Sequence, residues 1–250
     1  MTELYDTTRQ TWEDIWEGAS VQVELETLRY SRARQTIARY ERYLDRNGVI
    51  LEAGCGLASV VIYLRDKGFR VIGLDYAANA LRKAHAFDST LPLCAGDVHA
   101  LPYASGSLAA YLSFGVLEHF PHGMGPALRE AARVLRPGGI LVLTIPYPNL
   151  VWKLSQFRRR LQGASRLNQE DFYESTYTQH DLVREAQAAD FDVLEVTPTS
   201  HAFTLWGLGG PFRAPGYYRT SPLADRLGSL LARLAPWSFS FSTLLIGRRR

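Results

Sequence analysis

The sequence is poor in the features that mark secreted, metal-binding and membrane-spanning proteins. Its 250 residues include two cysteines, Cys55 and Cys94, which give neither a disulfide framework nor the spacing of a metal site. We therefore expect a reducing compartment, the cytoplasm, and no bound metal. The opening segment MTELYDTTRQTWED lacks the basic and apolar regions of a signal peptide. No apolar run approaches the roughly 18 residues that a membrane span needs.

A large excess of one charge is missing as well. The formal net charge is +3, and no stripe of lysine and arginine suits a nucleic acid, so we expect no nucleic-acid partner. What remains is an ordinary globular composition, 46% hydrophobic and 21% charged. A chain of this length can form one large domain with a real core.

Apolar runs alternate with amphipathic stretches from residue 48 onward. Helices are predicted at 57–68, at 77–87, at 125–139 with a Pro-Gly-Gly stop, and within 178–200. Strands are predicted at 49–54, 70–75, 91–97, 109–115 and 140–147, at the end of 178–200, and at 238–247. Continuous apolar strands separated by helices indicate a mostly parallel sheet covered on both faces. The last run alternates enough to be an antiparallel edge strand. We therefore predict a single doubly wound α/β domain with seven strands.

Three segments lie outside this repeat. Residues 1–47 are predicted to form a helical cap that holds Trp12 and Trp16. Residues 148–177 and 199–238 are variable insertions, and the second contains an amphipathic helix. We expect the leucines of that helix to pack on the domain or on a subunit partner, with contact to a membrane surface as the alternative; they are Leu223, Leu227, Leu230, Leu231 and Leu234.

The first predicted strand runs into a glycine turn, VILEAGCGLAS, with Gly54 and Gly56 ahead of a helix. Such a turn lets a ligand approach the backbone and the helix N-terminus. A dinucleotide site has a third glycine where Ser59 stands. Glu52 would also repel a pyrophosphate, whereas it suits a ligand with a cation. S-Adenosylmethionine carries an ammonium and a sulfonium and no phosphate, so the turn favours this methyl donor over a dinucleotide.

Two further acids follow predicted strands. Asp75 ends the second strand, where a carboxylate can accept both ribose hydroxyls of an adenosine. This fits both a nicotinamide dinucleotide and S-adenosylmethionine. Asp97 follows the third strand, where it can accept from an adenine amino group while the backbone N–H of Val98 meets the ring. This third feature favours S-adenosylmethionine.

Five segments together resemble one family. They are LEAGCGLAS, VIGLDYA, AGDVHALPY, SFGVLEHF and LRPGGILVLTIP, which cover about residues 48–147. In order and spacing they are similar to class I S-adenosylmethionine-dependent methyltransferases, of the methyltransferase-11-like branch that often acts on small molecules or lipids. The resemblance extends through TQHDL and AADFDV to about residue 197. It implies a Rossmann-like fold in which residues 48–147 form the cofactor-binding core.

The resemblance also implies roles for single residues. Gly54 and Gly56 would line the methionine part of the cofactor, and Glu52 would help to orient it. Asp75 would hold the ribose hydroxyls, and Tyr76 would pack on the adenine. Asp97 and Val98 would contact the adenine edge, and Ser113 and Phe114 would offer a backbone carbonyl to the ammonium. Ala58 departs from the family, because a third glycine is common there.

His119 is the candidate catalytic residue, as a general base towards the acceptor or as a residue that orients the loop. His180 and His201 are weaker candidates. The acceptor atom is left open among O, N and C. Aromatic residues in the variable segments favour an enclosed site for a natural-product, sugar-conjugate or quinone-like acceptor. They are Trp12, Trp16, Tyr147, Trp152, Phe172, Tyr173, Tyr177, Phe203, Trp206, Phe212, Tyr217 and Tyr218.

Two other functions stay open beside methyl transfer. One is a nicotinamide-dependent oxidoreductase, which Glu52, Ser59 and Asp97 oppose. The other is a module that binds S-adenosylmethionine without turning it over to S-adenosylhomocysteine. The oligomeric state is not predicted, and contact with a membrane is expected only if the acceptor is a lipid.

Overall fold

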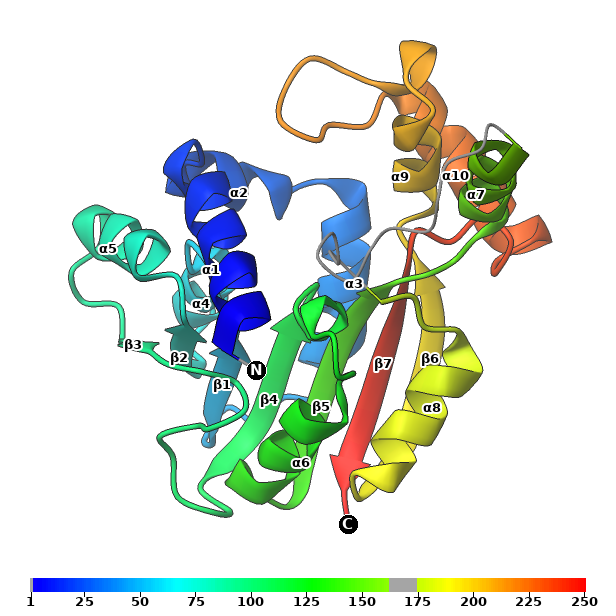
Figure 1. Ribbon diagram of the computed structural model, residues 1–250. Helices are drawn as coiled ribbons and strands as arrows, with labels where there is room; N and C mark the ends of the chain where they lie inside the picture. The colour runs from blue at the N-terminus through cyan, green and yellow to red at the C-terminus, as the bar shows by residue number, and fades with distance from the viewer. Residues whose placement is uncertain (1, 162–174) are drawn as a thin grey trace.

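The fold is built on one seven-stranded sheet. A computed structural model describes residues 2–161 and 175–250 (Figure 1). The strands lie in the order β3-β2-β1-β4-β5-β7-β6. Their bounds are β1 Val49–Ala53, β2 Arg70–Asp75, β3 Leu93–Ala95, β4 Leu108–Phe114, β5 Leu135–Pro146, β6 Phe191–Thr199 and β7 Ser242–Arg249. Strands β1 to β5 pair in parallel, and β7 pairs antiparallel with both β5 and β6. The predicted doubly wound α/β fold with an antiparallel last strand is confirmed.

Helices cover both faces of the sheet, because its central strands are apolar on both sides. On one face α4 (Ser59–Asp66) and α5 (Ala78–Phe87) pack over Ile50 and Leu112. On the other face α6 (Gly125–Val134) and α8 (Gln179–Ala188) pack over Leu51 and Tyr111. The buried side chains therefore form two separate layers, one on each face of the sheet. The carboxyl ends of the parallel strands all lie at the same end of the sheet.

Strand β7 is not an edge strand, and the prediction of an edge position is wrong. It lies between β5 and β6, so β6 forms the edge. The predicted run began at residue 238 with an alternating SFSFS, whereas the strand begins at Ser242. Within it Leu244, Leu245 and Ile246 are all fully buried, as expected of a strand with neighbours on both sides.

The predicted helix at 125–139 is too long. Helix α6 ends at Val134, and β5 begins directly at Leu135. Leu135 pairs with Leu108 of β4, and the register shifts before Ala110 pairs with Ile140. Gly138 within this irregular stretch has a φ of +75°. The Pro-Gly-Gly segment therefore bends the start of a strand.

Three helices precede the sheet, α1 (Thr2–Glu17), α2 (Val21–Thr27) and α3 (Ser31–Glu41). Ile37 and Tyr40 of α3 are buried, and so is Leu44 just beyond it. Helix α1 is attached to α5, because the Lys83 ammonium donates to the carbonyl oxygens of Trp16 (2.8 Å), Glu17 and Ala19 (3.3 Å). These carbonyls close the C-terminal end of α1, where a cation is favourable.

The later insertions contain α7 (Leu150–Leu161), α9 (His201–Gly207) and α10 (Pro222–Leu234). Phe172 and Tyr173, predicted near the acceptor, lie outside the described residues. Four of the α10 leucines, Leu223, Leu227, Leu230 and Leu234, are exposed, so the expectation that they pack on the domain is wrong for these four. The fifth, Leu231, packs against the cluster of Ala202, Leu205 and Ala224. The helix instead buries its small residues, Ala224 and Gly228, because these let it approach α9 closely.

Cys55 and Cys94 are free thiols. Within residues 2–161 and 175–250, no helix combines the length and apolar character needed to cross a bilayer. The same residues hold no cluster of three or more metal-ligating side chains. The cytoplasmic location stays a prediction.

Candidate active site

A cavity of about 350 Å³ opens at the carboxyl ends of β1, β2 and β4, the edge where doubly wound sheets bind ligands. Its size falls in the range of small-molecule sites, about 300 to 1,000 Å³. Residues of α1, α2 and α3 line the side of the cavity opposite the strand ends. Seven of the ten predicted site residues line it, namely Glu52, Gly54, Gly56, Asp75, Tyr76, Phe114 and His119.

The glycine turn after β1 forms the floor of the cavity. Gly54 and Gly56 have φ values of +79° and +49°, a region that costs other residues energy. The backbone N–H groups of Gly54 and Cys55 donate to the carbonyl of Leu74 at 2.7 and 3.0 Å, which ties the turn to β2. A Cβ on Gly56 would lie 2.5 Å from Cζ2 of Trp16. Only glycine therefore fits beneath α1 at this position.

Asp75 joins the glycine turn to the turn after β2. Its carboxylate is buried, with Oδ2 accepting from the Gly56 N–H at 2.7 Å and Oδ1 from the Ala77 N–H at 2.8 Å. Burial raises the pKa of Asp75, and the backbone hydrogen bonds oppose that rise. Each carboxylate oxygen has two acceptor sites, so beside the backbone N–H groups of Gly56, Ala77 and Tyr76 the Asp75 carboxylate retains capacity for a hydroxyl donor from the cavity.

Glu52 is a second buried carboxylate on the same wall. Its Oε2 accepts from the Val61 N–H in the first turn of α4 at 3.1 Å. The carboxylate therefore accepts from a backbone N–H that has no partner within α4, and it lines the cavity at the same time. Burial raises the pKa of Glu52 well above its ordinary value, and the charge of Asp75 raises it further. Burial also raises the pKa of Cys55 well above its ordinary value, so this thiol is not a nucleophile at neutral pH.

The negatively charged groups on this wall of the cavity favour a cation and disfavour a phosphate. Two carboxylates, Glu52 and Asp75, flank the glycine turn. Among the described residues that line the cavity, the basic side chains are Arg32 and His119, which belong to α3 and to the loop after β4. A ligand with an ammonium and a sulfonium would offset the electrostatic cost of burying two carboxylates, whereas the carboxylates would repel a pyrophosphate.

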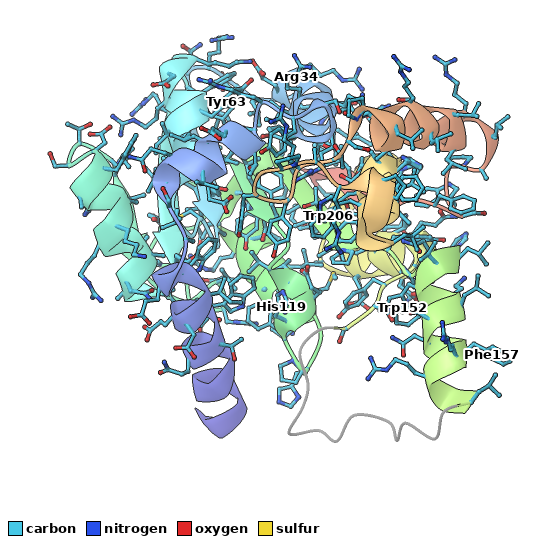
Figure 2. The ribbon with its side chains drawn as sticks, turned by 90° about the horizontal axis from the view of Figure 1, so that it is seen from above. Arg34, Tyr63, His119, Trp152, Phe157 and Trp206 are labelled. Carbon is cyan, nitrogen blue, oxygen red and sulfur yellow. The ribbon has the colours of Figure 1, made fainter. Side chains whose placement is uncertain are left out.

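His119 enters the cavity from a short 3₁₀ helix, η1 (Leu117–His119), after β4. Figure 2 places it near the middle of the molecule in the view from above. The ring is buried, and its centroid lies 5.1 Å from the ring of Trp12, edge to face. Its Nε2 lies 4.0 Å from a carboxylate oxygen of Glu118. The loop thus holds an imidazole between an aromatic face and an acid.

The two weaker histidine candidates lie elsewhere. His180 is exposed in the first turn of α8. His201 is buried at the start of α9, where its Nε2 donates to the carbonyl oxygen of Pro236 at 2.7 Å. Burial lowers the pKa of His201, which keeps it neutral. Neither residue lines the cavity, so of these three histidines His119 alone reaches it.

Three predicted site residues do not line the cavity. Asp97 follows β3 with its side chain half exposed, and its Oδ1 accepts from the His99 N–H at 2.9 Å. Val98 is buried in the layer beneath α6. Ser113 is buried within β4, paired with Leu143 of β5. Their contacts with a cofactor stay predictions.

The sequence prediction missed part of the opposite wall. Tyr40 belongs to α3, and its ring packs 5.4 Å from that of Phe114. Its hydroxyl, however, is buried at the cavity without a hydrogen-bond partner in the described part of the chain. Burial raises the pKa of Tyr40 well above its ordinary value. A single phenol within an apolar helical pattern was the signal available in the sequence.

Glu24 and Arg32 were also missed, because the sequence has no signal that brings α2 and α3 to the site. Both line the cavity. The Arg32 guanidinium donates to the Tyr218 carbonyl at 2.7 Å and lies 4.4 Å from the centre of the Phe203 ring. It thereby attaches the aromatic segment after α9 to α3. Trp12 and Trp16, which the sequence placed among the aromatics of an enclosed acceptor site, stack at 5.8 Å and line the cavity.

Comparisons with known proteins agree with this geometry. Residues 51–143 match the family model described as a methyltransferase domain. The chain is 35% identical over 100 residues to the malonyl-[acyl-carrier protein] O-methyltransferase of Pseudescherichia vulneris, covering 40% of this chain and 39% of the relative. It is 37% identical over 101 residues to the demethylmenaquinone methyltransferase of Mycolicibacterium vanbaalenii, covering 40% and 42%. The matches thus span about two fifths of these relatives' length.

Solved structures extend the likeness to the whole fold. A chain from the complex between the Haloferax volcanii Trm112 methyltransferase activator and a methyltransferase superposes with a TM-score of 0.66 at 18% identity. The superposition covers 95% of this chain and 96% of that one. An S-adenosylmethionine-dependent methyltransferase from Archaeoglobus fulgidus gives 0.61 at 15% identity, covering 90% and 97%. At such identities the likeness concerns the fold alone.

Proposed function

We propose that this protein moves the methyl group of S-adenosylmethionine to a small organic acceptor, because residues 51–143 match the family model described as a methyltransferase domain. The observation that supports this best is the pair of buried carboxylates, Glu52 and Asp75, beside a glycine turn in one cavity. The product would be S-adenosylhomocysteine. The cofactor supplies an electrophilic methyl group on an excellent leaving group.

The residues around the cavity would hold the cofactor in a fixed pose. Gly54 and Gly56 would line its methionine part, and Asp75 would accept from the ribose hydroxyls. Glu52 would lie near the cationic end, where its negative charge is favourable. The backbone carbonyls of Ser113 and Phe114 would accept from the ammonium. Much of the catalysis would then come from alignment and the exclusion of water.

The adenine end would lie between β2 and β3. Tyr76 lines the cavity and would pack on the ring. Asp97 and Val98 follow β3 in the chain and would contact the edge of the base. Asp97 is half exposed, which leaves its carboxylate accessible to an exocyclic amino group.

The acceptor would bind between the N-terminal helices and the loop after β4. We propose that residues 1–47 form the cap of a single domain, that 48–147 hold the cofactor, and that 148–177 and 199–238 select the acceptor. Trp12, Trp16 and Tyr40 give that side of the cavity an aromatic lining. An aromatic lining supports an organic acceptor such as a natural-product intermediate, a sugar conjugate or a quinone-like lipid, methylated on O, N or C.

His119 would be the general base if the acceptor is a hydroxyl or an acidic carbon. Replacing it by alanine should then lower kcat by about 10²- to 10⁴-fold and leave the affinity for S-adenosylmethionine unchanged. If the residue only orients the loop, we expect KM and cofactor affinity to change together with kcat. Steady-state kinetics and calorimetric titration of the cofactor separate these outcomes.

The proposal is tested with methyl-labelled S-adenosylmethionine and an extract of the source organism. We expect label in the small-molecule or lipid fraction. Label in protein or nucleic acid would overturn the proposed acceptor class. Cofactor binding with no labelled product in any fraction would favour a module that binds without turnover, whereas binding of a nicotinamide dinucleotide in its place would favour an oxidoreductase.

A further inference from the structure

Helix α7 has a row of large apolar side chains that faces solvent. The row consists of Leu150, Leu154, Phe157 and Leu161, and these residues are between 43% and 73% exposed. Their spacing of four, three and four residues places them on one side of the helix. Figure 2 shows Phe157 at the outer rim of the molecule, pointing away from the sheet.

Helix α10 repeats this arrangement. Leu223, Leu227, Leu230 and Leu234 have the same spacing and are between 36% and 73% exposed. Large side chains do not fit on the opposite side of the helix, where even a Cβ on Gly228 would lie 2.6 Å from the backbone nitrogen of Ala202 in α9. The close packing of Gly228 on α9 therefore fixes the leucines outward.

The two helices lie at the same end of the molecule. Both views place α7 and α10 on the side of β6 and β7, away from α5 (Figure 1 and Figure 2). The Leu150 N–H donates to the Ser238 carbonyl at 2.8 Å, and the Asn149 side-chain amide donates to the Ser240 carbonyl at 2.8 Å. The start of α7 is thus attached to the segment that leaves α10.

The polar sides of both helices are basic. Helix α7 has no acidic residue, and its Lys153, Arg158 and Arg159 are exposed. Helix α10 exposes Arg226 and Arg233, whereas its one acid, Asp225, accepts from the Thr220 hydroxyl at 2.8 Å. Leucine and phenylalanine on one side with arginine and lysine beside them is the pattern of helices that lie in the interface of an anionic bilayer.

We propose that α7 and α10 dock this protein on the surface of a membrane that contains anionic lipids. The two apolar rows would enter the interfacial region, and the basic side chains would contact the headgroups. A second copy of the chain fits this surface less well, because a symmetric contact would bring the basic side chains of both copies together. The inference does not rest on the proposed methyl transfer. Helix α9, which packs on α10, starts beside Ser200 in the cavity wall, so docking would bring that wall near the bilayer.

The test is co-sedimentation of the full chain with vesicles. Vesicles of phosphatidylcholine with about 30% phosphatidylglycerol should bind the protein about tenfold better than pure phosphatidylcholine, and salt should weaken the binding. The double variant Phe157→Glu, Leu230→Glu should lose about tenfold or more of this binding. The matched control is Phe87→Glu, because Phe87 is 43% exposed and belongs to α5, which lies on the opposite side of the molecule (Figure 1).

Thermal unfolding checks that each variant folds, which is expected because the replaced side chains are exposed. Absence of binding to the anionic vesicles would overturn the proposal. Equal loss of binding in Phe87→Glu and in the double variant would also overturn it. A dimer in analytical ultracentrifugation that the double variant abolishes, with no vesicle binding by the parent chain, would assign the surface to a second copy instead.

Discussion

At the scale of single residues, Glu52 links pH to stability. Burial raises its pKa in the folded protein, so the folded state binds more protons than the unfolded chain above pH ~4, where an ordinary glutamate ionises. The free energy of unfolding therefore decreases as the pH rises from about 4 towards the pKa of the folded state. A bound cation would offset the electrostatic cost of the buried Glu52 charge, so ligand binding should increase the free energy of unfolding.

Replacing Glu52 by glutamine should separate these two effects. A glutamine oxygen can still accept from the Val61 N–H, but the buried charge is removed. We expect the free energy of unfolding at pH 7 to increase by on the order of 1 kcal/mol, and the difference from the parent protein to vanish near pH 4. Affinity for S-adenosylmethionine should fall. Urea unfolding at both pH values measures the first effect, and a pH-independent difference would contradict the assignment.

Asp75 has a structural role and a proposed binding role. In Asp75→Ala the N–H groups of Gly56 and Ala77 lose their acceptor, which should lower the free energy of unfolding by about 1–3 kcal/mol. Affinity for S-adenosylmethionine should fall at least about tenfold, or roughly 1.4 kcal/mol. Calorimetric titration well below the melting temperature of the variant is the measurement. Unchanged affinity in a folded variant would exclude Asp75 from the ribose site.

The sequence predicted the wall formed by the glycine turn, whereas it missed Glu24, Arg32 and Tyr40 on the opposite wall. Glu52, Gly54, Gly56 and Asp75 belong to turns whose chemistry is local, so their spacing was enough to predict them. Tyr40 reaches the cavity only because α3 packs across the sheet edge. Contacts between such distant segments leave no local pattern in a single sequence.

At the scale of elements, α1 depends on a few contacts with α5. The Lys83 ammonium donates to three carbonyls at the end of α1, and the Asn79 side-chain amide donates to the Glu13 carbonyl at 2.6 Å. Trp12 and Trp16 on the same helix line the cavity. The attachment of α1 thus sets the position of two rings over the site.

Lys83→Ala should therefore loosen α1 without unfolding the sheet. We expect faster amide hydrogen exchange in residues 10–17, by about tenfold, and a melting temperature within a few degrees of the parent. Arg82→Ala is the matched control, because Arg82 is exposed on the same helix. If Arg82→Ala accelerates exchange in the same segment to the same extent, the three hydrogen bonds of Lys83 do not explain the attachment.

Element boundaries were predicted less well than element types. The Pro-Gly-Gly segment ends helices in many proteins, yet here it lies inside β5, because Leu135 already pairs with Leu108. The leucines of α10 follow an amphipathic pattern, but a pattern does not say which side faces the protein. The close contact of Gly228 with Ala202 turns that side of α10 towards α9, and this contact exists only in the folded structure.

At the scale of the whole molecule, the sheet depends on its seventh strand. Strand β7 pairs with both β5 and β6, and composition or periodicity could not have placed it there, because strand order is set by contacts between distant residues. Burial of each of its large apolar residues contributes about 1.5–3 kcal/mol. Three such residues, Leu244, Leu245 and Ile246, are fully buried.

A chain that ends at residue 241 should therefore lose its cooperative fold. The lost burial is comparable with the whole stability of a domain, about 5–15 kcal/mol, and β6 would lose its only strand partner in the described sheet. Near-ultraviolet circular dichroism during thermal unfolding is the measurement. Removal of Arg250 alone is the control, because its contact with Asp192 is exposed and worth little. A cooperative transition in the shorter chain would contradict the central role of β7.

The position of β7 also constrains how the chain folds during synthesis. Strand β6 leaves the ribosome first, yet the strand that joins it to the sheet follows roughly 40 residues later, a delay of several seconds at ordinary translation rates. For that interval β6 is an unpaired strand beside an open edge of β5. Such edges pair with other chains, so molecular chaperones and the speed of translation over residues 200–241 should influence how much nascent protein reaches the native sheet.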